Sequence, residues 1–219
     1  MARLTLIVFL LVLFSCSKVE EKTKEEKIQT LHEIGYSNDS SNAKQIEPYL
    51  KDKDAEVVSF ACYYIGYLRA REYIPTLVAF LSDGDDQIVN MAGAGLAEMV
   101  DSRDVWILKD LYPLLHHKFL LARLSAIEAI GKIGSETSLD KLIEIFDASS
   151  TGQKARIISA LGEIGSSKAL PLLNQYLLEI NKMDFSVPNK GGGRGVDFHP
   201  EVLKAITEEA ILAIEKGRA

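Results

Sequence analysis

Ile130-Gly131-Lys132-Ile133 and Leu161-Gly162-Glu163-Ile164 are two copies of one short phrase, and they decide the fold. Earlier versions stand at 65–68 and 96–99, with a glycine or an alanine in the second place. This small residue therefore recurs after 31, 34 and 31 residues. A period of that length is typical of stacked repeat arrays, in which each unit packs only against its neighbours.

Apolar residues keep a constant spacing around the small residue. They stand one position before it, two positions after it and 16 positions before it in each of the four units. A polar turn separates the groups, most clearly at 52–54 (DKD) and 83–86 (DGDD). Apolar residues at three- and four-residue spacing predict two amphipathic helices per unit, here termed helix A and helix B. The predicted core comprises Leu50, Leu81, Leu115, Phe146, Ile65, Leu96, Ile130, Leu161, Leu68, Met99, Ile133 and Ile164.

The array is predicted to open with a single helix. Residues 30–35 (TLHEIG) align with 160–165 (ALGEIG), which places His32 at the position of the small residue, 34 residues before Gly66. This helix is expected to begin near Glu25 and to act as an N-terminal cap. Gly35, Gly134 and Gly165, three positions after the small residue or its equivalent, are predicted to be helix C-caps. The predicted fold is thus an all-α, α-α superhelical solenoid of about five helical hairpins.

The arrangement resembles the HEAT repeat. It is most similar to the short repeats of bilin-lyase-like proteins, whose second helix reads Val-Arg-x-x-Ala-x-x-Ala-Leu-Gly-x-Ile-Gly. The resemblance covers residues 31–180. Arg123 and Lys154 occupy the basic position of the family, whereas Val58 and Val89 replace it in the earlier units. The family's ladder of Asp–Arg pairs between turns is therefore expected to be broken in the first half of the array.

The first 15 residues have a different character from the rest of the chain. Arg3 precedes a nearly uninterrupted apolar run over residues 4–14. A helix needs about 20 residues to cross a bilayer, so this run is too short to span one. A charged start, a short apolar run and small residues after it are typical of a secretory signal peptide over residues 1–15.

The end of that run, Leu13-Phe14-Ser15-Cys16, resembles the lipobox of bacterial lipoproteins. The resemblance implies that Cys16 is lipidated and anchors the protein in the cell envelope. Ser17 does not resemble an inner-membrane retention signal, so the outer membrane is favoured over the inner membrane. An ordinary cleaved signal peptide with an incidental cysteine is the alternative.

Two segments depart from the repeat pattern. Residues 16–24 are dominated by Lys and Glu, which predicts a flexible tether because they hold too little apolar surface to fold. Residues 181–199 contain four glycines within five positions, which predicts a long loop between the two helices of the last unit. The solenoid is therefore expected over 25–219, with a loop insertion at 181–199.

The charge balance excludes one class of ligand. The whole chain has a formal net charge of −6, and cleavage before Cys16 removes one more positive charge. Nucleic-acid binding calls for a clustered basic face, so a nucleic-acid partner is not expected.

One face of helix B is the candidate binding surface. Positions three before and one after the small residue lie four apart, so they share the face that points away from the core. In HEAT-type stacks the second helices line the concave surface, which implies a mostly acidic groove with a tyrosine pair near its N-terminal end. A solvated helix face with scattered tyrosines is an equally weighted alternative. The candidate partner-binding residues on this face are Tyr63, Tyr67, Glu98, Glu128, Lys132 and Glu163.

The glycine-rich loop supplies three further candidates. Phe185, Arg194 and Phe198 are expected to touch a partner. A backbone nest for an anion, with Arg194 adding charge, is the alternative. The loop follows no predicted strand and lacks the Gly-Lys-Ser/Thr ending of a phosphate loop, which favours partner contact.

The sequence offers no recognisable reaction centre. His116 and His117 are adjacent and have no cysteine or acidic residue at ligand spacing, so no metal site is expected. HEAT-like deoxyhypusine hydroxylases bind paired iron through several His-Glu dipeptides, whereas this chain has only His32-Glu33. We therefore expect no enzyme activity, no metal and no cofactor.

Together these features predict a lipid-anchored, non-catalytic scaffold or adaptor. It is expected to bind a protein partner through its concave helix-B face and the 181–199 loop. A HEAT-like enzyme or cofactor binder related to bilin lyases is the second hypothesis, and a purely structural envelope protein is the third.

Overall fold

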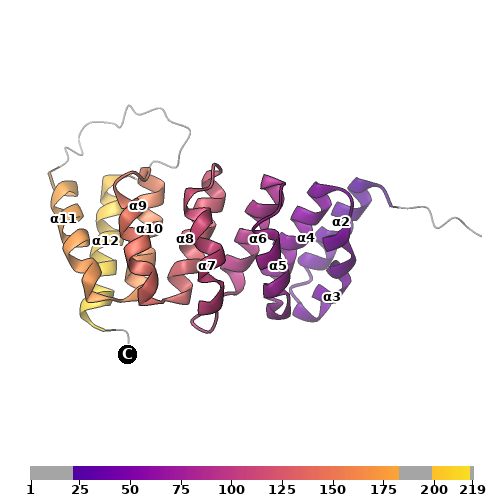
Figure 1. Ribbon diagram of the computed structural model, residues 1–219, viewed down its shortest axis with the longest axis horizontal. Helices are drawn as coiled ribbons and strands as arrows, with labels where there is room; N and C mark the ends of the chain where they lie inside the picture. The colour runs from indigo at the N-terminus through magenta and orange to yellow at the C-terminus, as the bar shows by residue number, and fades with distance from the viewer. Residues whose placement is uncertain (1–21, 183–198, 218–219) are drawn as a thin grey trace, which may run out of the picture.

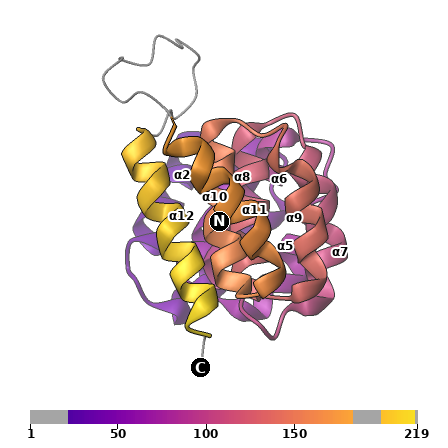
Figure 2. The same cartoon turned by 90° about the vertical axis from the view of Figure 1, so that its left-hand side faces the viewer.

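The computed structural model describes residues 22–182 and 199–217, where helices are the only regular secondary structure. The helices follow one another along the long axis of the molecule (Figure 1). Seen from its C-terminal end, the stack has two layers, with α12, α10 and α8 on one side and α11, α9 and α7 on the other (Figure 2). The signal peptide, Cys16 and residues 183–198 lie outside the described residues.

One layer holds helix B of each hairpin, preceded by the lone first helix. Its members are α2 (Lys24–Gly35), α4 (Ala55–Tyr67), α6 (Asp86–Met99), α8 (Leu120–Ile133), α10 (Thr151–Ile164) and α12 (Pro200–Glu215). Each of these helices packs against the next one in the layer. The first helix begins one residue before its predicted start, where Thr23 and Glu26 form a reciprocal capping box.

The other layer holds the A helices, which begin with 3-10 turns. They are η1 (Ser40–Asn42), α3 (Ala43–Ile46) and η2 (Glu47–Lys51); η3 (Arg71–Tyr73) and α5 (Ile74–Phe80); η4 (Val105–Ile107), α7 (Leu108–Leu111) and η5 (Tyr112–His116); η6 (Glu136–Ser138) and α9 (Leu139–Phe146); and η7 (Ser167–Ala169) and α11 (Leu170–Ile180). Five hairpins follow the N-terminal helix, which confirms the predicted all-α solenoid.

Proline positions explain why some A helices are interrupted. Pro75 and Pro171 stand at the second residue of α5 and α11, where a missing backbone N–H costs nothing. Pro48 and Pro113 lie later in their units, at the second residue of η2 and η5. A proline there cannot continue the α-helical hydrogen bonds, so the helix tightens to 3-10 geometry for its last turn.

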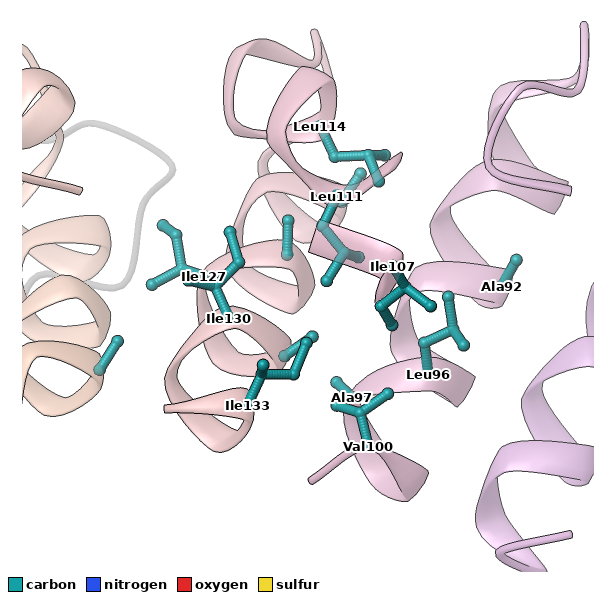
Figure 3. Close-up of a cluster of buried hydrophobic side chains, with 14 of the residues drawn as sticks. Ala92, Leu96, Ala97, Val100, Ile107, Leu111, Leu114, Ile127, Ile130 and Ile133 are labelled. Carbon is teal, nitrogen blue, oxygen red and sulfur yellow. The ribbon is translucent and has the colours of Figure 1, made fainter. Parts of the chain in front are cut away.

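The core confirms the predicted apolar register. The residues 16 before and one before the small residue are buried in all four units. Among the residues two after it, only Ile164 is partly exposed. Figure 3 shows the middle of this core, where Leu96 of α6, Leu111 of α7 and Ile130 of α8 lie in one cluster of buried apolar side chains.

The small residue allows neighbouring B helices to approach closely. A Cβ atom on Gly66 would lie 2.2 Å from the Cα of Gly95, and one on Gly131 would lie 2.8 Å from the Cα of Ala160. Each contact joins the small residue of one unit to a small residue two positions earlier in the register of the next. The repeat phrase thus sets the spacing between repeats as well as the phase of the core.

Glycines three positions after the small residue end two of the B helices. Gly134 and Gly165 have φ angles of 67° and 73°, the left-handed geometry expected of C-caps. The same prediction is wrong for Gly35, which is the last residue of α2 and is followed by a right-handed cap at Tyr36. Gly35 instead leaves room for a ring, because a Cβ there would lie 2.0 Å from Cδ1 of Tyr64.

Candidate functional site

The predicted tyrosine pair forms part of a larger group on the B layer. Tyr63 is half-buried and Tyr67 is 41% exposed on α4, with ring centroids 6.3 Å apart. Tyr36, at the end of α2, is 68% exposed and meets Tyr67 edge to face at 6.3 Å. We term Tyr36, Tyr63 and Tyr67 the tyrosine surface. Sequence reasoning missed Tyr36 because it lies past the end of its helix, outside the repeat register.

A buried pair of rings supports the tyrosine surface. Tyr64 is almost fully buried and its hydroxyl is hydrogen-bonded to Nδ1 of His32. Burial, followed by the neighbouring Tyr36, raises the pKa of Tyr64 well above its usual value, so its hydroxyl stays neutral. The ring lies 5.8 Å from Tyr36 and 6.5 Å from Tyr67, edge to face with both. Both exposed tyrosines therefore rest on a fixed base.

This aromatic cluster arises where the repeat pattern is broken twice. The other units place a small residue at register zero and a glycine or alanine two positions before it. In the first contact His32 and Tyr64 occupy those two places. The small-to-small contact between B helices becomes a contact between rings, and Phe60 adds a further ring 5.4 Å from His32. The two exceptions were visible in the sequence as departures from the pattern.

A hollow of about 460 Å³ adjoins the tyrosine surface. It lies at the C-terminal ends of three successive B helices, and the negative end of a helix dipole lies at each. Its lining residues are Asn38, Ser40, Tyr67, Leu68, Arg69 and Glu98. Two of the predicted partner-binding residues, Tyr67 and Glu98, thus meet at one hollow.

Two charged side chains of opposite sign border the hollow. Glu98 and Arg69 are both exposed, and no ion pair joins either to another charge among the residues that the structure describes. Arg69 stands in the left-handed region at φ 55°, which is unusual for a residue with a side chain. Sequence reasoning missed Arg69, although it stands in the register position that Gly134 and Gly165 occupy in later units.

Glu128 and Lys132 lie farther along the same layer and are engaged within the chain. Lys132 pairs with Glu128 at 2.9 Å and donates to the carbonyl oxygen of Ala97 at 2.5 Å. Arg156 of α10 reaches the other carboxylate oxygen of Glu128, also at 2.9 Å. These contacts tie α6, α8 and α10 together, so the charge on Glu128 is largely balanced by its neighbours.

The remaining predicted residues do not join the tyrosine surface. Glu163 is half-buried on α10, beside a second hollow of about 220 Å³ that it lines with Gly162 and Ala210. Phe185, Arg194 and Phe198 lie outside the described residues, as does the lipidation candidate Cys16.

The two family-type basic residues contact groups other than aspartates. Arg123 donates to the carbonyl oxygens of His117 at 2.5 Å and Lys118 at 3.1 Å. The ammonium group of Lys154 lies 5.0 Å and 5.3 Å from the ring centroids of Phe146 and Tyr176. Both residues therefore hold the A-to-B turns in place, but through carbonyls and rings.

The described residues contain no evident reaction centre. Within 22–182 and 199–217, no three His, Cys, Asp or Glu side chains gather closely enough to hold a metal ion. Cys62 is buried, and burial raises the pKa of its thiol to about 12, which leaves it unreactive at neutral pH. His117 lies 3.4 Å from Asp86 but has no further ligand-type neighbour in this part of the chain. No helix in the same ranges is both long and apolar enough to span a bilayer.

Comparison with solved structures shows the fold. An engineered protein matches over 90% of this chain and 94% of its own, with a TM-score of 0.60 at 14% identity. A designed armadillo repeat protein matches over 89% and 96%, with a TM-score of 0.57 at 16% identity. Another, solved in complex with the peptide (KR)4, matches over 91% and 95%, with a TM-score of 0.59 at 15% identity. These similarities place the chain among helical-repeat solenoids.

Comparison by sequence matches only part of the chain. No protein with a curated description matches the chain. The family model for HEAT repeats matches residues 108–182, which run from α7 to the end of α11. The repeat phrases at 65–68 and 96–99 lie before that segment and share its register and its two-layer packing. The match to HEAT repeats therefore covers the second half of the array, up to the end of α11.

Proposed function

We propose that this protein is a non-catalytic scaffold that binds a protein partner through the B-helix face. The observation that carries the proposal is the tyrosine surface, where exposed Tyr36 and Tyr67 stand on a buried base beside the carboxylate of Glu98. Tyrosines contribute strongly to interfaces because they bury a large area and lose few rotamers. The peptide complex of a designed armadillo protein supports this use of the fold.

The 181–199 segment is the second part of the proposed binding surface. It connects α11 to α12 in the chain, as the A-to-B connection of the last hairpin. Phe185, Arg194 and Phe198 are the residues proposed to contact the partner there.

We further propose that Cys16 carries lipid that anchors the protein in a bacterial cell envelope, with the outer membrane favoured. The apolar run and the Leu13-Phe14-Ser15-Cys16 sequence support this proposal. Bacterial lipoproteins of this type would carry more than one acyl chain, and more than one chain suffices for stable attachment to a membrane. The protein would therefore need no additional membrane contact.

Site-specific crosslinking in the source cells tests partner binding. A photo-reactive amino acid at position 67 is expected to capture one reproducible protein. The same residue at position 178, where Leu178 is 62% exposed on the A layer, is the matched control. Capture of the same set of proteins from both positions, or of none from position 67, would contradict the proposal.

Metabolic labelling tests the anchor. Cells that express the full chain are expected to incorporate a labelled fatty acid into it, and Cys16→Ser is expected to abolish incorporation and release the protein from membranes. A variant that still fractionates with the outer membrane would show that lipid on Cys16 is not the anchor.

A further inference from the structure

We infer that the tyrosine surface and the adjoining hollow receive a lysine- or arginine-bearing extended segment of the partner protein. This inference rests on the proposed binding function and specifies the chemistry of the partner. The cationic side chain would lie against Tyr67 and reach the carboxylate of Glu98, and the neighbouring part of the segment would cross Tyr36.

The shape of the site favours a side chain that inserts. Tyr67 belongs both to the tyrosine surface and to the lining of the hollow, so a segment that crosses the rings passes directly over the opening. The rings of Tyr36 and Tyr67 stand nearly perpendicular, with an interplanar angle of 82°. Tyr36 is 68% exposed and Tyr67 is 41% exposed, so both rings offer surface to the segment.

The charge of the site selects the sign of the ligand. Glu98 has no ion-pair partner among the described residues, in contrast to Glu128, which two cations neutralise. Residues 22–104 hold fifteen Asp and Glu against nine Lys and Arg, whereas 105–182 and 199–217 hold twelve against eleven. The half of the described chain that carries the tyrosine surface thus holds most of the net negative charge, and cations also bind favourably over tyrosine faces.

Arg69 is the one positive group in the lining of the hollow, and its charge allows a basic ligand to be distinguished from an acidic one. Its guanidinium repels a basic segment, so it limits affinity and discriminates against segments with closely spaced cations. If an acidic segment bound instead, Arg69 would be its main attraction and Glu98 its main obstacle. Replacing these two residues therefore moves the affinity in opposite directions for the two kinds of ligand.

Fluorescence anisotropy with two synthetic peptides provides the test. One peptide alternates Lys or Arg with Ser, and the other carries Glu in place of each Lys and Arg. Both are titrated with the full chain, purified in detergent. The basic peptide is expected to bind and to weaken as salt is added, because screening reduces the attraction between exposed charges. The acidic peptide is expected not to bind.

Variants then locate the site. Tyr67→Ala is expected to weaken binding of the basic peptide about tenfold or more, as for an interface hot spot, and Glu98→Gln by about threefold to tenfold. Arg69→Gln is expected to tighten it about twofold to fivefold, since a repelling charge is removed. Glu144→Gln, on the A layer, makes the same change in net charge as Glu98→Gln and is expected to have no effect. Thermal melting confirms that each variant is folded.

Several results would overturn the inference. These are binding of neither peptide, stronger binding of the acidic peptide, weaker binding on Arg69→Gln, or an equal loss on Glu98→Gln and Glu144→Gln. The crosslinking experiment at position 67 shows whether such a result contradicts only the basic chemistry of the ligand or also the proposed binding of a protein partner. If position 67 still captures one partner, and the crosslinked segment contains no Lys or Arg, binding stands and only the basic chemistry is wrong.

Discussion

Between α8 and α10, consecutive repeats are joined by a small-residue contact at Gly131 and an ion pair from Arg156 to Glu128. Between α2 and α4, the same layer is joined by the rings of His32 and Tyr64, and by Lys24, whose ammonium lies 2.6 Å from the carboxylate of Glu56. Both contacts keep the B helices in one layer. The difference shows that the HEAT-like geometry tolerates different chemistry between repeats, provided that the apolar core stays in phase.

The two halves also differ in what they leave exposed. In the second half, which contains the recognisable HEAT repeats, Glu128 is engaged by its neighbours. In the first half, the exposed rings of Tyr36 and Tyr67 rest on the buried ring of Tyr64, and Tyr67 lines a hollow with Glu98, a carboxylate without an ion-pair partner among the described residues. The part of the chain that departs most from the repeat pattern is thus the part with the strongest candidate site. Such departures are expected at functional sites.

The largest effect is expected from filling the tight contact between α4 and α6. Gly66→Val would place a Cβ 2.2 Å from the backbone of Gly95, which cannot yield as a side chain would. We expect a loss of roughly 3–5 kcal/mol in the free energy of unfolding, at the upper end of overpacking effects. Chemical denaturation measures it. Gly162→Val is the control, because there a Cβ lies 3.0 Å from the side chain of Ala210 and the loss should be clearly smaller.

The next largest effect is expected at an ion-pair cluster that joins the start of the second hairpin, at Arg71, to the start of the third, at Asp104. Arg71 makes two hydrogen bonds to Asp104, at 2.8 and 3.0 Å, and Asp104 is only 5% exposed. Arg71→Met would leave that carboxylate buried without its cation, at a cost of about 2–4 kcal/mol. Arg156→Met removes an exposed pair in the second half and is expected to cost about 0.5 kcal/mol or less. Equal losses in denaturation would contradict this contrast.

Acid is expected to loosen the first half before the second. The hydrogen bond from Lys27 lowers the pKa of Asp52, and both of these side chains are mostly buried. A carboxyl with a lowered folded-state pKa stabilises the protein above its unfolded value of about 3.9, and this contribution is lost as pH falls below it. In the second half the lowered pKa of Glu136 depends on the exposed Lys168.

Hydrogen exchange, corrected for intrinsic rates, measures this acid effect. Protection of α2 and α4 should fall before that of α8 and α10 as pH drops from 5 to 3, the range in which carboxyls of about 3.9 take up protons. Asp52→Asn should reduce the acid sensitivity of α2. Simultaneous loss of protection along the whole stack would show that the two halves unfold as one unit.

Much of the fold was predictable because the repeat phrase carries both phase and spacing. Leu50, Leu115 and Phe146 are buried as expected, and the number of hairpins is correct. The C-caps were predicted at Gly134 and Gly165 but wrongly at Gly35, because a glycine fits either a left-handed turn or a ring packed against it. Sequence alone does not distinguish these two uses.

The candidate site was predictable only in part. Tyr67 and Glu98 followed from the helix face, since residues four apart share it. Their convergence on one hollow depends on how α4 and α6 are offset, and this offset is set by the Gly66–Gly95 contact. Tyr36 and Arg69 lie beyond the ends of α2 and α4. The helical register does not predict side-chain direction there, so neither residue could be assigned to the site from the sequence.

The smallest effect concerns the cap position in the two halves. Arg69, Gly134 and Gly165 all stand three positions after the small residue, and all have φ between 55° and 73°. Arg69→Gly is expected to raise stability by about 0.5–1 kcal/mol, because glycine adopts this geometry without strain. Gly165→Arg should cost a similar amount, since no other atom lies within 4 Å of its Cβ position. If Arg69→Gly is destabilising instead, the guanidinium makes a stabilising contact at the hollow, and the repulsive role inferred for it would fail as well.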